Sequence, residues 1–474
     1  MPEDVEKVCK EVLKQVTPKD PERKKIENLS KKLEKRVASA AEELGVKAKV
    51  RVEGSVAKNT WLSQEPEIDV FMRVSKSIPR DSLGDVCLKV AKKATEGSKQ
   101  VERFADHPYL EAFVENIRVN IVPCYDVKQG EWMSATDRTP FHTDYMNAHL
   151  TDQMRAETRL LKKFMKGGSV YGAEIKVGGF SGYLCELLIL HYKSFPNTIK
   201  AFAEYRQGKI IDIAGFYDDR QREIKLLFDE PLVVIDPIDR ARNVASAVRN
   251  QKLYSFIAAT RGFLRKPGIE FFYPSETVPF SAGKMRNELK KRGSKIVFVV
   301  FEQADAVADI LWGQLYKSQR SLRKLIEMND FKVLRELPWS NEKDLSMFVF
   351  ELEDCCVPPI RKHLGPPLDK ENECEKFIAK YVESPEAVCG PYVEEGRWMV
   401  LVRRKFTDAC DLLRDRLKGG GRNAGVAEGI SQVIKRGFRV LVNEEIADVY
   451  ERDSGFAVFL TEFLRGRPKW LEAH

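Results

Sequence analysis

The stretch Glu53-Gly54-Ser55-Val56-Ala57-Lys58-Asn59-Thr60-Trp61, followed shortly by Glu67-Ile68-Asp69-Val70, decides what the first part of this chain folds into. Glycine at position 54 lets the backbone approach a ligand closely, and the serine beside it adds a hydroxyl donor. Side chains two positions apart in a strand project from one face, so Glu67 and Asp69 point together. The stretch therefore predicts a phosphate-binding turn and a strand that carries two carboxylates.

Paired carboxylates beside a phosphate-binding turn are the groups that nucleotidyl transfer needs. The attacking 3′-hydroxyl and the leaving pyrophosphate both need their charge neutralised, and two Mg²⁺ ions held by clustered carboxylates do this. Magnesium prefers hard oxygen ligands, completed by substrate phosphates. The alternative is an ordinary edge strand with two solvated acids. The Gly54-Ser55 turn upstream favours catalysis over that alternative.

The composition is typical of a soluble, multidomain protein. With 474 residues, 43% hydrophobic and 32% charged, we expect two to four domains. No apolar run reaches the roughly 18 to 20 residues that span a bilayer, and no signal-peptide pattern is seen, so we expect a cytoplasmic protein without a membrane partner. The nine cysteines include no CxxC pair, which argues against structural zinc. A net charge of +8 permits a nucleic-acid partner without establishing one.

The hydrophobic spacing divides the chain into three regions. The first 130 or so residues are expected to be mixed α+β around a small sheet, after two helices split near Thr17-Pro18. Residues 145–263 are expected to be mainly helical, and the chain becomes strand-rich again beyond Lys266. The expected helices cover residues 82–95, 158–166, 180–192, 241–263 and 304–328, and the expected strands cover residues 49–53, 68–74, 111–115, 117–125, 295–302, 346–352 and 397–402.

The glycine-serine turn and acidic strand resemble the nucleotidyltransferase superfamily of DNA polymerase beta. Longer strings resemble one branch of it, the archaeal class I CCA-adding enzymes, and their shared order makes the resemblance specific. The strings cover residues 20–265 well, and a weaker likeness continues to His363-Leu364-Gly365-Pro366-Pro367. They are residues 53–61, Val122-Pro123-Cys124-Tyr125, Asp137-Arg138-Thr139-Pro140-Phe141-His142, Tyr171-Gly172-Ala173-Glu174, Gly179-Phe180-Ser181-Gly182-Tyr183-Leu184 and residues 236–245.

The resemblance implies an α+β multidomain fold. Residues 1–140 would form a polymerase-beta-like nucleotidyltransferase head with a small mixed sheet, residues 141–265 a helical neck that recognises the nucleotide, and residues 266–474 an α/β body and tail that bind tRNA. It implies template-independent addition of C, C and A to the tRNA 3′ end from CTP and ATP, with Mg²⁺ as cofactor and pyrophosphate as product. The implied partners are the tRNA acceptor arm and a second copy of the chain in a homodimer.

The resemblance also assigns roles by position. Glu67, Asp69 and the residue at position 120 would bind the metals and perform catalysis. Arg242 would read C and A, a task that suits its forked guanidinium. The residues expected to contact the nucleotide are Gly54, Ser55, Lys58, Thr139, His142, Lys162, Tyr171 and Arg242.

Each of these residues also has a purely structural interpretation. Lys58 and Lys162 are alternatively solvated surface lysines, and Tyr171 is alternatively an aromatic that caps a loop. His142 is alternatively a hydrogen-bonded structural histidine. Arg242 alternatively starts a helix and pairs with Asp239.

Position 120 departs from the family pattern. The family's third metal-binding carboxylate falls on the strand Arg118-Val119-Asn120-Ile121-Val122-Pro123, where this chain has asparagine. Asparagine offers a neutral oxygen and cannot accept the hydroxyl proton, and loss of such a group typically removes a factor of about 10² to 10⁴ in rate. Three interpretations follow: a slow enzyme or one that recruits Asp126 or Glu115, a form altered to trap its substrate, or a paralogue that binds without catalysis.

Basic side chains in the last third of the chain are candidates for contacting tRNA. Together with Trp312 and Tyr316, a basic helix would follow phosphates and stack on terminal bases. The alternative is that each basic cluster is an ordinary solvated face. The candidates are Lys317, Arg320, Arg323, Lys324, Arg361 and His363.

Two other classes of protein share some of these features. A poly(A) polymerase or an oligoadenylate synthase has the same turn and paired acids, but it would not use CTP or stop after three additions. A non-catalytic relative, suggested by Asn120, would bind tRNA and nucleotide without releasing pyrophosphate. A DNA repair polymerase is disfavoured because no helix-hairpin-helix pattern occurs.

Overall fold

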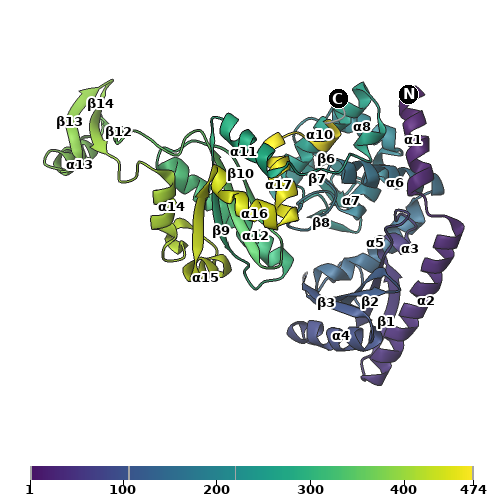
Figure 1. Ribbon diagram of the computed structural model, residues 1–474. Coiled ribbons are helices and arrows are strands. Elements are labelled where there is room, and N and C mark those ends of the chain that lie inside the picture. Colours follow the sequence, from purple (N-terminus) through teal and green to yellow (C-terminus); the bar gives the residue numbers. More distant parts are fainter. Residues whose placement is uncertain (1–2, 105–106, 219, 472–474) are drawn as a thin grey trace. The chain divides into compact units, whose positions relative to one another are not determined.

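The computed structural model describes residues 3–104, 107–218 and 220–471. The chain divides into two compact units, residues 1–276 with 467–474 and residues 277–466 (Figure 1). Each unit is built from helices and small sheets, which confirms the expected α+β multidomain fold. Among the described residues, no helix has the length and apolar character needed to cross a membrane.

The first unit begins with a mixed, five-stranded sheet in the order β1-β2-β5-β4-β3. The strand with the two carboxylates, β2, is antiparallel to β1 and parallel to β5, so it is an interior strand and the edge-strand alternative is wrong. Two helices, α2 and α4, pack on the face that buries Ile68 and Val70, which leaves Glu67 and Asp69 on the opposite face. The elements are α2 (Asp20–Glu43), β1 (Ala48–Glu53), α3 (Gly54–Ala57), β2 (Glu67–Val74), α4 (Arg80–Ala94), β3 (Lys99–Phe104), β4 (Pro108–Val114) and β5 (Ile117–Tyr125).

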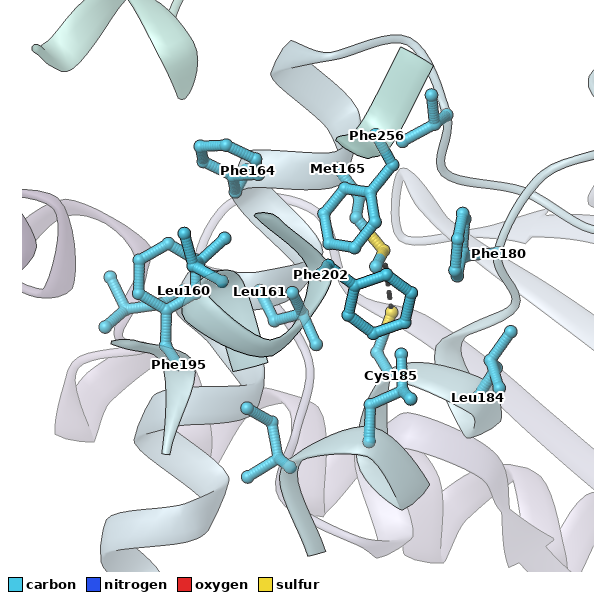
Figure 2. Packing of buried hydrophobic residues seen from close by; sticks show 14 of the residues in the cluster. Leu160, Leu161, Phe164, Met165, Phe180, Leu184, Cys185, Phe195, Phe202 and Phe256 are labelled. Carbon is cyan, nitrogen blue, oxygen red and sulfur yellow. Dashed lines mark hydrogen bonds between the residues drawn. The ribbon is translucent and has the colours of Figure 1, made fainter. Parts of the chain in front are cut away.

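A cluster of helices with an aromatic core forms most of the rest of the first unit. Figure 2 shows Phe180, Phe202 and Phe256 packed together, with ring centroids 4.9 Å apart for Phe202 and Phe256 and 5.0 Å apart for Phe180 and Phe256. Met165 and Cys185 join the helices α6 and α7 with their sulfur atoms 3.4 Å apart. The helices are α1 (Glu3–Val16), α5 (Thr139–His149), α6 (Asp152–Gly167), α7 (Gly182–Tyr192), α8 (Phe195–Ala203), α9 (Gln221–Leu227) and α10 (Asn250–Arg265), with the short η1 (Ala135–Arg138) and η2 (Ile269–Phe271).

The helix expected over residues 241–263 is wrong at its start. Residues 239–243 form a strand, β8 (Asp239–Asn243), which pairs with β7 (Leu232–Asp236), and β6 (Lys209–Asp212) completes a three-stranded sheet. The side chain of Asn243 accepts hydrogen bonds from the backbone of Val234 and Ala245, which fixes the strand and the turn after it. This antiparallel pairing with the preceding strand overrides the local helical spacing, and α10 begins only at Asn250.

Two smaller differences occur near the first sheet. Gly54-Ser55 is not a simple turn but the start of a single helical turn, α3. The edge strand β3 was not expected, because its alternating charged residues carry little hydrophobic signal. The other expected strands of this sheet are confirmed within a few residues.

The second unit contains two antiparallel sheets. In the sheet β10-β11-β9-β15, alternate residues of β9 face two separate cores, one formed with α12, α14 and α15 and the other with α11, α16 and α17. The second sheet has the order β12-β14-β13 and packs on α13. The elements are α11 (Ala282–Lys291), β9 (Lys295–Glu302), α12 (Ala308–Met328), β10 (Val333–Ser340), β11 (Leu345–Leu352), β12 (Ile360–Pro367), α13 (Glu371–Tyr381), β13 (Ala387–Glu394), β14 (Arg397–Arg403), α14 (Ala409–Leu417), η3 (Arg422–Ala424), α15 (Glu428–Arg436), β15 (Phe438–Val442), η4 (Asn443–Ile446), α16 (Ala447–Arg452) and α17 (Ser454–Arg465), and η5 (Lys469–Leu471) returns to the first unit.

Candidate active site

A pocket of about 360 Å³ in the first unit lies between β2 and the helices α5, α6 and α7. It brings together both predicted carboxylates and every residue that the resemblance assigns to the nucleotide. It also contains residues that were not predicted from the sequence. Its lining consists of Gly54, Ser55, Lys58, Glu67, Asp69, Ala135, Thr139, His142, Lys162, Tyr171, Ser181, Gly182, Tyr183, Glu186 and Arg242.

Asn120 is not among the pocket-lining residues but contacts both carboxylates from the neighbouring strand β5. It is the register partner of Asp69 in the parallel pair of β2 and β5. Its amide nitrogen Nδ2 donates to Oε1 of Glu67 at 2.6 Å and to Oδ1 of Asp69 at 2.9 Å. The three residues that were predicted to form the metal site are therefore adjacent, with a neutral donor where a third acid was expected.

The charge of Glu67 affects the ionisation of Asp69. Burial, followed by the negative charge of Glu67, raises the pKa of Asp69 to about 7, although Asn120 and Lys58 oppose the shift. Two like charges held this close favour the binding of a cation. Gly54, whose φ of +70° suits glycine, lets the α3 turn lie directly against Asp69.

The acids that were considered as replacements for the third carboxylate are engaged elsewhere. Asp126 pairs with Lys49 at 2.6 Å and with Arg73 at 2.7 Å. Glu115 pairs with Lys32 at 2.9 Å. Neither acid lines the pocket.

A buried network of two lysines and one glutamate forms the floor of the pocket. Lys58 Nζ lies 2.5 Å from Oε2 of Glu186, and Lys162 Nζ lies 3.4 Å from Oε1 of the same carboxylate. Thr60 Oγ1 donates to Glu186 at 2.6 Å and accepts from Lys162 at 3.0 Å. Both lysines are buried, so the surface-lysine alternative is wrong.

The two lysines stabilise the charged form of Glu186, whereas burial, together with the charge of Lys58, lowers the pKa of Lys162. Burial alone would raise the pKa of Glu186, but the charges of Lys58 and Lys162 outweigh it and hold that pKa below its ordinary value. The balance is one net positive charge at the pocket floor. The sequence did carry a signal for Glu186, because it is the one charged side chain in the otherwise apolar run Leu184–Leu190.

A second network lies on the other wall and centres on Asp236. Its carboxylate contacts His142 Nε2 at 2.8 Å, accepts from Arg242 Nη1 at 2.8 Å and accepts from the Tyr183 hydroxyl at 3.1 Å. The rings of His142 and Tyr183 pack with centroids 4.0 Å apart. Burial lowers the pKa of His142 despite this acidic partner.

Arg242 does not start a helix and does not pair with Asp239. It lies on β8 and bonds to Asp236, whereas Asp239 pairs with Arg138 at 2.7 Å. Arg242 remains 38% exposed in its side chain, so part of its guanidinium is free to meet a ligand. The helix-start alternative is therefore wrong.

The amino end of α7 also faces the pocket. Gly182 begins this helix after Ser181 has capped it by accepting from Leu184 N at 3.0 Å. The start of α5 differs, because the N–H of Thr139 is bonded to Thr136 O in η1 and Pro140 has no N–H. Helix amino ends carry partial positive charge and unpaired N–H groups that favour anions. Tyr171, whose buried hydroxyl lies next to Gly182, closes this side. The whole arrangement suits a phosphate chain held opposite two carboxylates.

The basic residues predicted to contact tRNA lie in the second unit and differ in their surroundings. Lys317, Arg320 and Lys324 are exposed along one side of α12. Arg323 is half-buried and already paired with Glu327 at 2.9 Å and Glu336 at 3.6 Å.

The remaining candidates for tRNA contact already interact with other side chains of the protein. Arg361 on β12 pairs with Asp330 at 3.4 Å. The ring of His363 stacks on Phe377 with centroids 5.9 Å apart. Trp312, which was expected to stack on bases, is 5% exposed within the core around α12, so that expectation is wrong.

Comparison with known proteins shows which protein family this chain resembles. The chain matches three family models in sequence order: a nucleotidyltransferase domain over residues 30–142, the second domain of tRNA nucleotidyltransferase over residues 156–273, and the C-terminal domain of CCA-adding enzyme over residues 292–443. The fold and the pocket are thus those of a nucleotidyltransferase.

Curated relatives identify the kind of nucleotidyltransferase to which the chain is similar. A CCA-adding enzyme of Methanosarcina barkeri is 36% identical and covers 96% of this chain and 97% of its own length. Those of Methanopyrus kandleri and Methanothermobacter thermautotrophicus are 35% and 34% identical over 98% and 96% of this chain, and 98% and 97% of their own lengths. This chain belongs to the family of CCA-adding enzymes. A solved structure of a cytoplasmic RNA terminal U-transferase covers 55% of this chain and 94% of its own, with 13% identity and a TM-score of 0.44, a likeness too low to bear on function.

Proposed function

We propose that this chain adds C, C and A to the 3′ end of tRNA from CTP and ATP without a nucleic-acid template. The observation that carries the proposal is the pocket in which Glu67 and Asp69 face two buried lysines, the amino end of α7 and Arg242. Family membership over nearly the full chain supports the same reaction.

In each addition the 3′-hydroxyl oxygen of the RNA forms a bond to the α-phosphorus of the nucleotide. The bond from that phosphorus to the bridging oxygen breaks, pyrophosphate leaves and the hydroxyl proton is released. Lys58, Lys162 and the amino end of α7 hold the triphosphate by charge and hydrogen bonds. Arg242, oriented by Asp236, contacts the incoming base.

The site fits a divalent cation, and we propose Mg²⁺. Among residues 3–104, 107–218 and 220–471, no group of three or more histidine, cysteine, aspartate or glutamate side chains is arranged to hold a metal. Magnesium does not need one, because it is usually bound by one or two carboxylates together with substrate phosphates. Glu67 and Asp69 supply that pair. The ion would neutralise the developing charge on the phosphates.

The partners follow from the reaction. The exposed side of α12 with Lys317, Arg320 and Lys324 offers a basic surface for the acceptor arm of tRNA. CTP and ATP are the small-molecule substrates, and the cytoplasm is the expected location. The homodimer stays a prediction.

Asn120 favours a second candidate function, a form that binds tRNA and nucleotide with little catalysis. Its neutral amide cannot accept the hydroxyl proton, while the rest of the pocket is complete. A poly(A) polymerase is the third candidate, and it would differ in its product.

The test is incorporation of labelled CTP and ATP into tRNA that lacks its CCA end, in the presence of Mg²⁺. We expect this chain to add three nucleotides and stop, and Asp69→Asn to add none. Addition by the Asn120→Asp variant alone would support the binding form. Long adenylate tails would support the poly(A) polymerase. Inactivity of both this chain and its Asn120→Asp variant, despite intact tRNA binding, would overturn the proposed function.

A further inference from the structure

Three strands of the first sheet bring three polar side chains into one row beneath the pocket. Asp69 on β2 is the register partner of Asn120 on β5, and Asn120 is the register partner of Glu111 on β4. Register partners project from the same face of the sheet, and in an antiparallel pair such as Asn120 and Glu111 their β-carbons are about 4.5 to 5.5 Å apart. The side chain of Asn120 therefore lies between two acidic neighbours, of which Glu111 is only 2% exposed.

Only one end of the Asn120 side-chain amide makes hydrogen bonds within the described part of the chain. Its nitrogen donates to Glu67 and Asp69, whereas its oxygen Oδ1 is buried and has no hydrogen-bond partner within the described part of the chain. A buried acceptor without a partner is unfavourable and calls for an explanation. The two ends of an amide have nearly the same shape, so a reversed amide fits the same space.

A reversed amide would turn its oxygen toward the carboxylate pair and its two hydrogens toward β4. The hydrogens then need an acceptor on that side, and Glu111 is the register partner there. Arg103 Nη2 donates to Oε1 of Glu111 at 2.9 Å, and Arg118 Nε donates to Oε2 at 2.7 Å. Each carboxylate oxygen accepts more than one hydrogen bond, so Glu111 retains room for the amide.

We propose that Glu111 is a positioning residue that holds the reversed Asn120 amide, so that Oδ1 replaces the missing carboxylate as a neutral ligand. This inference rests on the proposed function, because it requires a divalent cation at Glu67 and Asp69. Partners that orient metal ligands contribute to metal affinity although they do not touch the ion.

The same geometry explains why residue 120 is asparagine in a chain with Glu111. Aspartate at position 120 would place three carboxylates side by side across adjacent strands, and like charges directly opposite one another destabilise a sheet. Asparagine avoids that repulsion. Residues 111 and 120 thus form a matched pair, one charged and one neutral.

The experiment measures Mn²⁺ binding by electron paramagnetic resonance in the full chain and in variants. Glu111→Gln and Glu111→Met both remove the charge, but only glutamine retains an acceptor oxygen. We expect Glu111→Met to bind Mn²⁺ about tenfold more weakly and Glu111→Gln to retain affinity within about threefold. Both are repeated with Asn120→Asp, whose carboxylate needs no amide acceptor, and there the two variants should bind alike.

The midpoint of thermal unfolding without metal gives a second readout. Asn120→Asp should lower the midpoint when Glu111 is present, and adding Glu111→Gln should restore it. Equal Mn²⁺ affinities for Glu111→Gln and Glu111→Met in the Asn120 chain would overturn the inference and leave the proposed function intact. Mn²⁺ binding that does not respond to Asp69→Asn would overturn the proposed metal site, and the inference with it.

Discussion

A β-carbon on residue 54 would overlap Oδ2 of Asp69. The backbone at Gly54 and the carboxylate of Asp69 therefore fit together only because glycine has no side chain. The turn that precedes the strand thus determines where one of the two acids is held.

Gly54→Ala should displace the Asp69 carboxylate and strongly reduce nucleotide addition. Misplacement of a reacting group by about 1 Å costs on the order of 10²-fold in rate. Gly45→Ala is the matched control, because Gly45 has a similar φ of +68° but open space around its β-carbon position. Steady-state kcat checks the prediction, and equal losses in the two variants would contradict it.

Glu186→Gln should destabilise the first unit, because Lys58 and Lys162 would lose their buried counter-charge. Breaking a buried pair by removing one partner costs about 3 to 5 kcal/mol. Glu27→Gln serves as the control, since Glu27 and Lys31 form an exposed pair on the surface of α2, where ion pairs contribute little to stability. Urea unfolding of both variants checks the difference, and similar midpoints would argue against the network.

Arg242→Lys should raise the KM for CTP and ATP by about tenfold, because lysine cannot bond to Asp236 and a base with one rigid fork. Arg240→Lys, two positions earlier on the same strand, lies outside the pocket and should leave KM unchanged. Nucleotide titrations at saturating tRNA provide the measurement. An unchanged KM in Arg242→Lys would exclude Arg242 from nucleotide recognition.

The exposed basic side of α12 should account for part of the salt dependence of tRNA binding. Each lost phosphate contact lowers the slope of log affinity against log salt by about 0.7 to 0.9. Alanine at Lys317, Arg320 and Lys324 together should therefore reduce the slope by about 2 to 3. Filter binding over a salt series checks this.

Two controls accompany the α12 variant. Alanine at Lys7, Lys10 and Lys14 removes three lysines with the same spacing on α1 and should leave the slope unchanged. Arg323→Ala should also have little effect, because its charge is already paired with Glu327 and Glu336. A slope that falls equally in the two triple variants would show that only net charge matters.

The spacing of hydrophobic residues was sufficient to predict many of the helices and strands. The alternation around Glu67 and Asp69 predicts β2 correctly, because a strand with one buried face has a period of two. The helix with Lys162 was also expected, because its apolar residues recur at helical spacing. In both cases the residues that decide the structure are neighbours in the sequence.

Contacts between distant segments were not predictable in this way. Asp236 bonds to His142, 94 residues away, and Glu186 bonds to Lys58, 128 residues away. Trp312 is buried because residues of the distant strands β9 and β11 belong to the same core. The motifs shared with the family identified the residues that line the pocket. The ion pairs and hydrogen bonds between them became visible only in the structure.

The first helix packs with the helical cluster although the five-stranded sheet follows it in the chain. Val5, Val12 and Val16 belong to the aromatic cluster, and α1 lies against α6, which comes after the sheet. The carboxylate-bearing sheet is therefore inserted between two parts of the helical cluster. It is joined to that cluster by chain at both of its ends, so the cluster must close around residues that come before and after the sheet in the sequence.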